Sequence, residues 1–273
     1  MKTELYTLET LSNLHVGAGD INFGVIDNQV QRDSVTNLAN INSSSLKGAF
    51  REHFSKEDED DTNMVKFIFG QENNSNETQA GAYNFFEAQL LTRPVRSSLK
   101  AYFCATSPSI IKSFLESVEV FNIAFDDELK NVLKELSELK PKKETPLVFE
   151  DIQNTILEDD KAAYNNFDTS KLKELLGEDI ALFEDSAFKE LDLPVLARNA
   201  LENGVSKNLW YEEVVPKKSK FFFFIRKPSN LDNADKKDKL EKFERSFDNA
   251  NIVQFGANKS IGYGFSRVTK ISL

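Results

Sequence analysis

One aspartate stands shortly before a segment that could bind an anion. Asp27 lies in the stretch GVIDNQVQRDS (residues 24–34), among glycine and polar residues, and INSSSLKGAFR (residues 41–51) follows it. An aspartate in a loop commonly forms a turn by bonding to its own backbone. It can also hold Mg²⁺, an ion that keeps several waters and uses few carboxylates. Asp20 and Asp33 are near in sequence, so both interpretations stay open.

The segment at residues 41–51 has the pattern of a helix start followed by cations. Ser43–Ser45, with Ser44 at their centre, can cap a helix whose first N–H groups lack partners. Such a helix start favours an anion. Lys47 and Arg51 lie four residues apart and therefore share one face of the helix. The pattern predicts a binding site for phosphates, although an ordinary capped amphipathic helix would show the same residues.

A second candidate binding element is the glycine loop NKSIGYGFSRV (residues 258–268). Gly262 and Gly264 flank Tyr263, and Lys259 lies nearby. Glycine lets a polymer approach the backbone closely, and a tyrosine can stack on a base. A simple hairpin turn is the alternative interpretation.

The two histidines and the single cysteine indicate little further chemistry. His15 lies on the loop before Gly17 and could contact phosphate or act in acid–base chemistry. His53, at the end of the predicted helix, is interpreted as structural. Cys104 alone excludes an internal disulfide and a cysteine-based zinc cluster, and its apolar surroundings predict a core position. The sequence contains no P-loop, no HExxH motif and no Ser-His-Asp order.

Composition predicts a folded, acidic protein. The chain has 273 residues, a net charge of −10 and 23 phenylalanines, which favour a packed core over disorder. Much of the acidity is clustered in short runs, so the remaining surface could still hold a basic groove. The first residues lack the apolar run of a signal peptide, and no stretch reaches transmembrane length. We therefore expect a soluble cytoplasmic protein that does not contact a membrane.

The predicted elements that would position these residues follow a recognisable order. Hydrophobic patterns predict strand, helix, strand, strand and helix at residues 3–10, 45–54, 82–95, 99–106 and 108–118. One more strand would complete a ferredoxin-like βαββαβ unit. KFFFFIRK (residues 220–227) is the natural candidate, so a large insertion must intervene.

The rest of the chain is interpreted as insertions and a closing segment. We expect an exposed acidic insertion near 55–80 and a helical insertion near 122–190. A long hairpin or arm fits Leu193–Pro216, where Asn203-Gly204 supplies the turn. Leu240, Phe243 and Phe247 mark a later helix, and the chain then ends as strand, glycine loop, strand.

Six segments occur together in one order: LHVGAGDINFGVIDNQVQRD, INSSSLKGAFRE, IFG, FFEAQLLTRPVRS, NLWYEEVVP and VQFGANKSIGYG. This set resembles the RAMP-superfamily backbone subunit of type III-B CRISPR (Cmr) effector complexes. The resemblance implies one α+β domain over residues 1–273, with a ferredoxin-like (RRM-like) palm, large insertions and a protruding β-hairpin thumb near 193–216. It also implies partners: a CRISPR RNA guide, target RNA, further copies of the chain and other Cmr subunits.

The resemblance also assigns roles to residues. Asp27 matches the family's catalytic aspartate, which cuts target RNA with a divalent metal. The metal implied is Mg²⁺, with Mn²⁺ as the alternative. The proposed reaction is attack of a ribose 2′-OH on the adjacent phosphate. We find no second metal ligand, and Glu212 and Glu213 are the only guesses. The RNA-binding residues implied are His15, Arg32, Ser44, Lys47, Arg51, Arg198, Lys259, Gly262 and Gly264.

Two other functions remain open at this point. The chain could be a non-cleaving scaffold with the same fold and the same RNA. It could also be a metal-independent nuclease that processes CRISPR RNA through His15, although a Tyr/His/Lys cluster near the N-terminus is missing. Dependence of cutting on Mg²⁺ would separate the three hypotheses.

Overall fold

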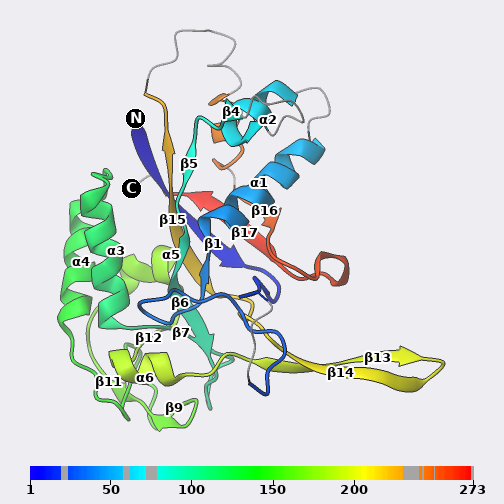
Figure 1. Ribbon diagram of the computed structural model, residues 1–273. Helices are drawn as coiled ribbons and strands as arrows, with labels where there is room; N and C mark the ends of the chain where they lie inside the picture. The colour runs from blue at the N-terminus through cyan, green and yellow to red at the C-terminus, as the bar shows by residue number, and fades with distance from the viewer. Residues whose placement is uncertain are drawn as a thin grey trace.

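A large mixed β-sheet forms the centre of the molecule (Figure 1). The computed structural model describes residues 1–19, 24–57, 62–71, 79–229, 240–241, 243–248 and 250–271. Along the sheet the strands follow the order β11-β8-β12-β7-β6-β15-β1-β17-β16, with β2 added to β6 and β5 to β15. The main strands are β1 (Lys2–Thr10), β6 (Ala88–Val95), β7 (Phe103–Thr106), β15 (Lys220–Lys227), β16 (Asn251–Gln254) and β17 (Phe265–Lys270). The short ones are β2 (Asn40–Ile41), β5 (Asn84–Phe85), β8 (Leu147–Val148), β11 (Ala163–Tyr164) and β12 (Ile180–Leu182).

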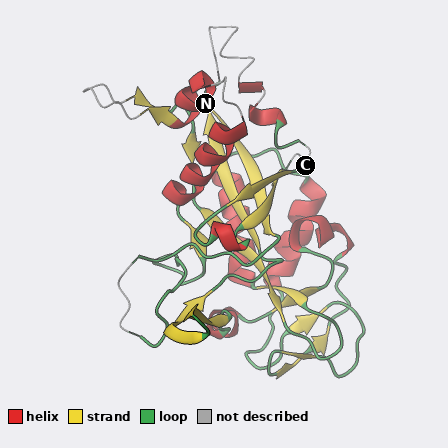
Figure 2. Cartoon of the chain, turned by 90° about the vertical axis from the view of Figure 1, so that its right-hand side faces the viewer, coloured by secondary structure: helices red, strands yellow, loops and turns green. Residues whose placement is uncertain are grey.

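Helices cover both faces of this sheet, as the view turned by 90° shows (Figure 2). The helices are α1 (Ser43–Glu57), α2 (Thr62–Phe69), α3 (Pro108–Val120), α4 (Asp127–Glu138), η1 (Ser170–Leu172), α5 (Lys173–Leu176), α6 (Asp185–Glu190) and η2 (Lys259–Ile261). Small two-stranded sheets pair β3 (Gly70–Gln71) with β4 (Gln79–Ala80) and β9 (Ile156–Leu157) with β10 (Asp160–Lys161). None of the described helices has the length and apolar character needed to cross a membrane.

The phenylalanine run of β15 explains why this strand lies at the centre. Side chains of successive strand residues point to opposite faces. Phe223 contacts Phe50 of α1, whereas Phe222 contacts Phe114 of α3. Because a helix covers each face, both sets of side chains are buried, and the strand contains a continuous apolar run.

The place of β15 differs from the sequence prediction. The strand pairs antiparallel with β1 on one side and with β6 on the other. The prediction that it closes the unit after α3 is wrong, since β17 follows it in the chain and pairs with the free side of β1. The predicted strand at 99–106 is also shorter, because only Phe103–Thr106 is extended. Helices α1 and α3 confirm the predictions at 45–54 and 108–118.

Both predicted insertions contain more structure than expected. The region near 122–190 has the predicted helices α4 and η1–α5, the latter ending at Gly177. It also contributes β8, β11 and β12, which extend the sheet beyond β7. The prediction of a helical insertion is therefore incomplete. In the region near 55–80, α2 buries Met64, Val65, Ile68 and Phe69. Residues 58–61 and 72–78 of that region lie outside the described residues.

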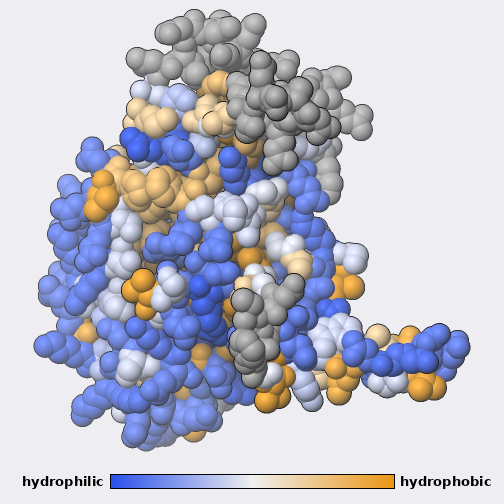
Figure 3. Space-filling view, in the orientation of Figure 1, coloured by the Kyte–Doolittle hydropathy of each residue, from blue (hydrophilic) through white to orange (hydrophobic). Residues whose placement is uncertain are grey.

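A β-hairpin projects from the body of the molecule, as Figures 1 and 3 show. Its strands are β13 (Val195–Glu202) and β14 (Val205–Glu213), paired antiparallel. Asn203 and Gly204 have φ values of 52° and 79° and form the predicted turn, since a type I′ turn needs positive φ at both positions. Most side chains beyond the hairpin base are exposed. The hairpin therefore contributes little to the core of its own chain.

Candidate functional site

The loop that carries Asp27 lies against the base of the hairpin. The Asn28 N–H donates to the Tyr211 carbonyl at 3.1 Å, and the Glu213 N–H donates to the Asn28 carbonyl at 2.8 Å. These bonds add the loop to β14 as a short parallel bridge. The backbone of the hairpin thus fixes the position of the loop.

The other side of the same loop is held by the N-terminal glycine loop. The Ala18 N–H donates to the Gln29 carbonyl at 3.0 Å, and the Gln31 N–H donates to the Val16 carbonyl at 2.7 Å. The Asp27 loop is therefore the middle of three backbone segments, and it has hydrogen-bonded neighbours on both sides.

The Asp27 carboxylate is exposed and oriented. Its Oδ2 accepts the backbone N–H of Tyr211 at 2.7 Å. This bond crosses to the hairpin, whereas the turn-forming bond typical of a loop aspartate is made to its own neighbouring backbone. The geometry presents a carboxylate to solvent at the point where the hairpin leaves the body.

Glu213, at the base of the hairpin, stabilises the segment that follows Asp27. Its buried carboxylate accepts the Val30 N–H at 3.0 Å through Oε2 and the Arg32 guanidinium through Oε1. Arg32 also donates to the Asn37 carbonyl at 3.1 Å. Arg32, predicted to bind RNA, is thus placed in an ion pair that closes the loop after Asp27.

Glu212, the neighbouring carboxylate, links the hairpin to the second glycine loop. Its Oε2 accepts Arg198 Nη1 at 2.7 Å, and its Oε1 accepts Asn258 Nδ2 at 2.6 Å. The Arg198 guanidinium also lies over the rings of Trp210 and Tyr263, at 5.5 Å and 5.6 Å from their centroids. Arg198 is therefore held at the hairpin base with about a fifth of its side chain exposed (22%).

These contacts decide how a metal ion could be held. Both oxygens of Glu212 and of Glu213 already accept hydrogen bonds within the protein, so their guessed role as metal ligands has no support. Among the described residues, no three His, Cys, Asp or Glu side chains stand close enough to form a metal site. Of the carboxylates described at this junction, Asp27 is then the one that remains as a candidate metal ligand. That arrangement fits Mg²⁺ only where RNA phosphates complete the coordination, which is the usual manner in which this ion is bound.

Of the two nearby aspartates, the described one, Asp33, has its own partners. Asp33 accepts the Thr36 N–H at 2.6 Å and the Val35 N–H at 3.1 Å, so it forms a turn. Partial burial acts to raise the pKa of Asp33, but the hydrogen bonds from Thr36 and Val35 outweigh it and lower the pKa. Asp20 lies outside the described residues.

His15 is buried beneath the same junction. Its Nδ1 donates to the Glu213 carbonyl at 2.7 Å, and its own carbonyl accepts the Ala257 N–H at 2.8 Å. Gly256 packs so closely that a Cβ would lie 2.3 Å from the His15 carbonyl oxygen. His15 therefore supports the hairpin base, and this burial argues against a role as the acid or base of a nuclease.

The glycine loop near the C-terminus is a tight turn with one open position. At Gly264, φ is 80° and a Cβ would lie 1.8 Å from the Phe255 carbonyl oxygen, so only glycine fits. At Gly262 no atom lies within 4 Å of the equivalent position. Lys259 forms an ion pair with Glu52 of α1. The turn thus leaves open space over Gly262 and is linked to α1.

The start of α1 is exposed, as the sequence suggests. Ser43–Ser45 lie within its first turn, and the preceding Asn42 accepts the first helical bond from the Leu46 N–H at 2.9 Å. The helix therefore begins at Ser43, directly after Asn42, and the three serines that were predicted to cap it lie inside its first turn. Lys47 and Arg51 are partly exposed on the outer face, opposite the buried Phe50.

The structure brings most predicted site residues into one junction. Asp27, Arg32, His15 and Arg198 meet at the hairpin base, and Arg198 also contacts the loop that contains Gly262. Ser44, Lys47 and Arg51 lie on α1, which contacts the glycine loop through the Glu52–Lys259 ion pair and through packing of Phe50 against Phe255. Sequence reasoning missed Asn258 and the positioning roles of Glu212 and Glu213.

A mixed sheet with a projecting hairpin, and a loop carboxylate at the hairpin base, define an α+β protein with a polar surface at one edge. The model of the RAMP superfamily matches residues 7–267. The chain belongs to the RAMP superfamily.

Individual relatives extend this result. The chain is 29% identical to the CRISPR system Cmr endoribonuclease Cmr4 of Pyrococcus furiosus, over 98% of this chain and 96% of that protein. Its fold is similar to a chain of the type III-B Cmr-beta complex bound to cognate target RNA (TM-score 0.80, 23% identity, 99% and 97% covered). It is also similar to the oligomeric Cmr4 crystal structure from Pyrococcus furiosus (TM-score 0.73, 23% identity, 99% and 98% covered).

Proposed function

We propose that the chain is the backbone subunit of a type III-B CRISPR effector complex and that it cleaves target RNA. Several copies would bind along one CRISPR RNA guide, beside other Cmr subunits in the cytoplasm. The similarity to a Cmr endoribonuclease over nearly the whole chain supports this proposal. The observation that carries it is the exposed Asp27 carboxylate, held by backbone bonds at the base of the projecting hairpin.

The order of the strands supports a ferredoxin-like palm. In chain order, β1, α1, β6, β15, the helical stretch with Leu240 and Phe243, and β17 give a βαββαβ unit. The sheet order β6-β15-β1-β17 places the first strand between the third and the fourth. Everything from β7 to β14 is then an insertion into this palm, and the β13–β14 hairpin is the thumb.

The guide would bind along α1 and the glycine loop. The residues of the first turn of α1 near Ser44 are exposed, and the N–H groups of a first turn lack helical partners. Lys47 and Arg51 of the same helix add positive charge, which favours an anion there. Gly262 leaves open space for a sugar or phosphate. The Lys259–Glu52 ion pair holds the two elements together, so one RNA backbone could contact both.

The thumb would separate bases of the paired strands. Leu201, Val205 and Leu209 are exposed along the hairpin, and apolar side chains inserted between base steps unstack and kink nucleic acids. A kinked nucleotide can bring its 2′-OH in line with the adjacent phosphorus, which is the main requirement of this reaction.

Cleavage would proceed by attack of the 2′-oxygen on the phosphorus with departure of the 5′-oxygen. The products are a 2′,3′-cyclic phosphate and a 5′-hydroxyl. Asp27, together with RNA phosphates, would hold a divalent ion, Mg²⁺ or Mn²⁺, which stabilises the charge that develops on the phosphate. The role of this chain is to place the Asp27 carboxylate beside the kink and to hold it there through Tyr211.

The test is cleavage of a matched, end-labelled RNA by the assembled complex in Mg²⁺, with EDTA as the control. Regularly spaced products that require Mg²⁺ are expected. Tight binding of matched RNA without any cut would favour the scaffold hypothesis. Cutting that persists in EDTA would favour the metal-independent nuclease.

A further inference from the structure

A buried arginine on β6 has a donor without a partner. Arg93 is 7% exposed. Its Nη1 donates to the Leu191 carbonyl at 2.9 Å and its Nη2 to the Asp192 carbonyl at 2.5 Å. Its Nε is buried and has no hydrogen-bond partner. A buried N–H group without an acceptor is costly, so this position calls for an acceptor from outside the chain.

Arg93 lines a cavity of about 420 Å³ beside the hairpin base. The walls of the cavity are mostly apolar. Tyr102 and Pro94 supply one part of the lining, and Leu193, Pro194 and Pro216, which flank the hairpin strands, supply another.

The charges around the cavity balance. Arg96 lies at its rim and donates to Glu158 through Nε at 2.8 Å. Asp192 is the second carboxylate of the lining, and its backbone carbonyl accepts Arg93 Nη2. Burial lowers the pKa of Arg93 to about 10, so the group stays protonated at neutral pH. Two cations and two anions leave no net charge, which favours a neutral ligand that carries an acceptor.

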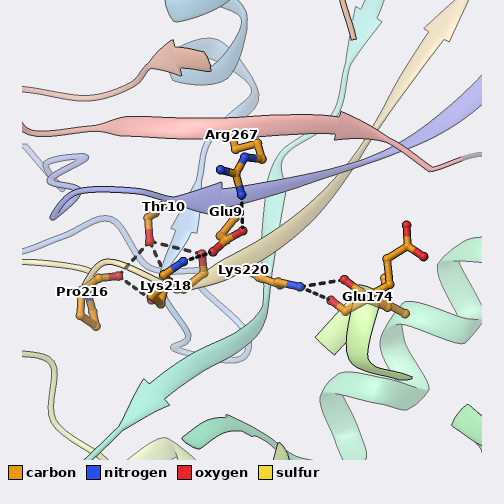
Figure 4. Close-up of polar contacts among 9 residues, drawn as sticks. Glu9, Thr10, Glu174, Pro216, Lys218, Lys220 and Arg267 are labelled. Atoms are coloured by element: carbon orange, nitrogen blue, oxygen red, sulfur yellow. Dashed lines mark hydrogen bonds and ion pairs between the residues drawn. The ribbon is translucent and has the colours of Figure 1, made fainter. Parts of the chain in front are cut away.

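The cavity is preformed, because the chain at Pro216 is fixed (Figure 4). The Pro216 carbonyl accepts the Thr10 hydroxyl at 2.9 Å and the Ser219 hydroxyl at 2.8 Å. The next residue but one, Lys218, forms an ion pair with Glu9 at 2.9 Å. These contacts anchor the segment after the hairpin to β1.

The cavity also lies near the Asp27 junction. The carbonyl of Pro194, which lines the cavity, accepts the Val214 N–H at 2.9 Å. Val195, the residue after Pro194, pairs with Glu213, and Glu213 forms the ion pair with Arg32 beneath the Asp27 loop. An RNA strand that crosses the hairpin base could therefore reach the cavity.

We propose that this cavity binds one unpaired nucleobase of the RNA. The flat ring would lie against Tyr102 and the prolines, and a carbonyl or ring nitrogen of the base would accept the Arg93 Nε–H. Unpaired bases are commonly bound in this way, by stacking on an aromatic ring and by hydrogen bonds to their edges. The proposal rests on the proposed function, since it takes RNA as the source of the base.

The experiment is photo-crosslinking of the full chain assembled on oligouridine RNA that contains 4-thiouridine. Crosslinked peptides are identified by mass spectrometry. We expect crosslinks in the segments that contain Tyr102 and Pro194. Tyr102→Leu should lower their yield about fivefold or more, the effect typical of losing one stacked base. Tyr164→Leu, an exposed tyrosine at the far edge of the sheet, is the matched control and should change nothing.

A second variant tests the hydrogen bond. Arg93→Lys keeps the charge but removes the Nε donor together with the two Nη bonds to the Leu191 and Asp192 carbonyls. It should lower the yield while the chain keeps one cooperative thermal transition, which is measured beside it. The proposal fails if crosslinks map only elsewhere or if Tyr102→Leu leaves them unchanged. It also fails if abasic RNA binds as well as oligouridine and inorganic phosphate competes, because the ligand is then a phosphate. In these cases retained RNA binding leaves the proposed function standing, whereas a chain that binds no RNA would overturn both.

Discussion

Replacing Asp27 by alanine and by asparagine separates its two roles. The carboxylate accepts the Tyr211 N–H at 2.7 Å, and it is the negative charge we propose for cleavage. Alanine removes both the acceptor and the charge. Asparagine keeps an acceptor oxygen of the same shape and removes only the charge.

The expected magnitudes differ between stability and rate. Loss of the bond to Tyr211 costs about 1 kcal/mol, so Asp27→Ala should lower the free energy of unfolding by at least about that amount. For a chain of this size this lowers Tm by about 2 °C. Asp27→Asn, an exposed change, should stay within about 0.5 kcal/mol of the native stability. Both variants should cleave about a hundredfold to a thousandfold more slowly, the usual loss for one electrostatic stabiliser.

The assay is single-turnover cleavage of matched, labelled RNA by complexes assembled with native or variant chain, with EDTA controls. Binding of guide and target is measured in parallel. Because the proposed role of Asp27 exists only at the reacting phosphate, both variants should bind RNA as the native chain does.

One result would refute this reasoning directly. If Asp27→Asn cuts at the native rate and positions while Asp27→Ala does not, the carboxylate acts only by holding the loop to Tyr211. Native cutting by both variants would move our preference to the scaffold hypothesis or to another residue.

Four further expectations follow from other parts of the structure. Lys47→Glu should weaken RNA binding, and RNA binding of the native chain should fall as salt rises, because phosphate contacts release counterions; unchanged RNA retention and assembly in mobility shifts would reject this role. Replacing residues 200–208 by Asn-Gly should leave one cooperative thermal transition but abolish regular cut spacing; a lost transition would show that the hairpin is part of the core. Gly262→Ala should lower the free energy of unfolding by about 1–2 kcal/mol because of its left-handed backbone, and Gly264→Ala should lower it by more because its Cβ would also clash. Denaturant unfolding measures both, and an equal or smaller loss for Gly264→Ala would contradict the tight turn. Burial raises the pKa of Cys104 to about 11, so a thiol reagent at pH 8 should label the native chain far more slowly than the unfolded chain; rapid native labelling would contradict its buried place.

Local patterns predicted the elements whose causes are local. The start of α1, the proline that opens α3 and the Asn203-Gly204 turn all depend on residues within a few positions of one another. Such signals survive in the folded chain because tertiary contacts do not oppose them here.

Strand neighbours could not be predicted in the same way. The phenylalanine run of β15 indicates a strand buried on both faces, but not that β1 and β6 flank it. Pairing is decided by residues more than a hundred positions apart. The short strands β8 and β12 were missed because two or three extended residues carry no period.

The candidate site was predicted in part for a related reason. Asp27 and Arg198 were found through the resemblance, and the structure brings both to the hairpin base. Their partners gave no such signal: the Tyr211 N–H that holds Asp27 is 184 positions away, and Glu212, which holds Arg198 across the hairpin, also binds Asn258. The adjacent pair Glu212-Glu213 at the end of a strand was the available signal, because two buried carboxylates require donors.

The Glu212-Glu213 pair also explains how the hairpin base fixes the positions of the Asp27 loop and the glycine loop relative to each other. Successive residues of a strand point to opposite faces, so the two carboxylates hold different elements. Glu212 holds Asn258 of the glycine loop, and Glu213 holds Val30 and Arg32 after Asp27. Breaking a buried ion pair on one side is strongly unfavourable, so the three segments should move as one unit. The distance from the hairpin to Asp27 is then fixed by the protein. If the hairpin kinks the RNA as we propose, each cut should fall at a constant position relative to the kink, whatever the RNA sequence.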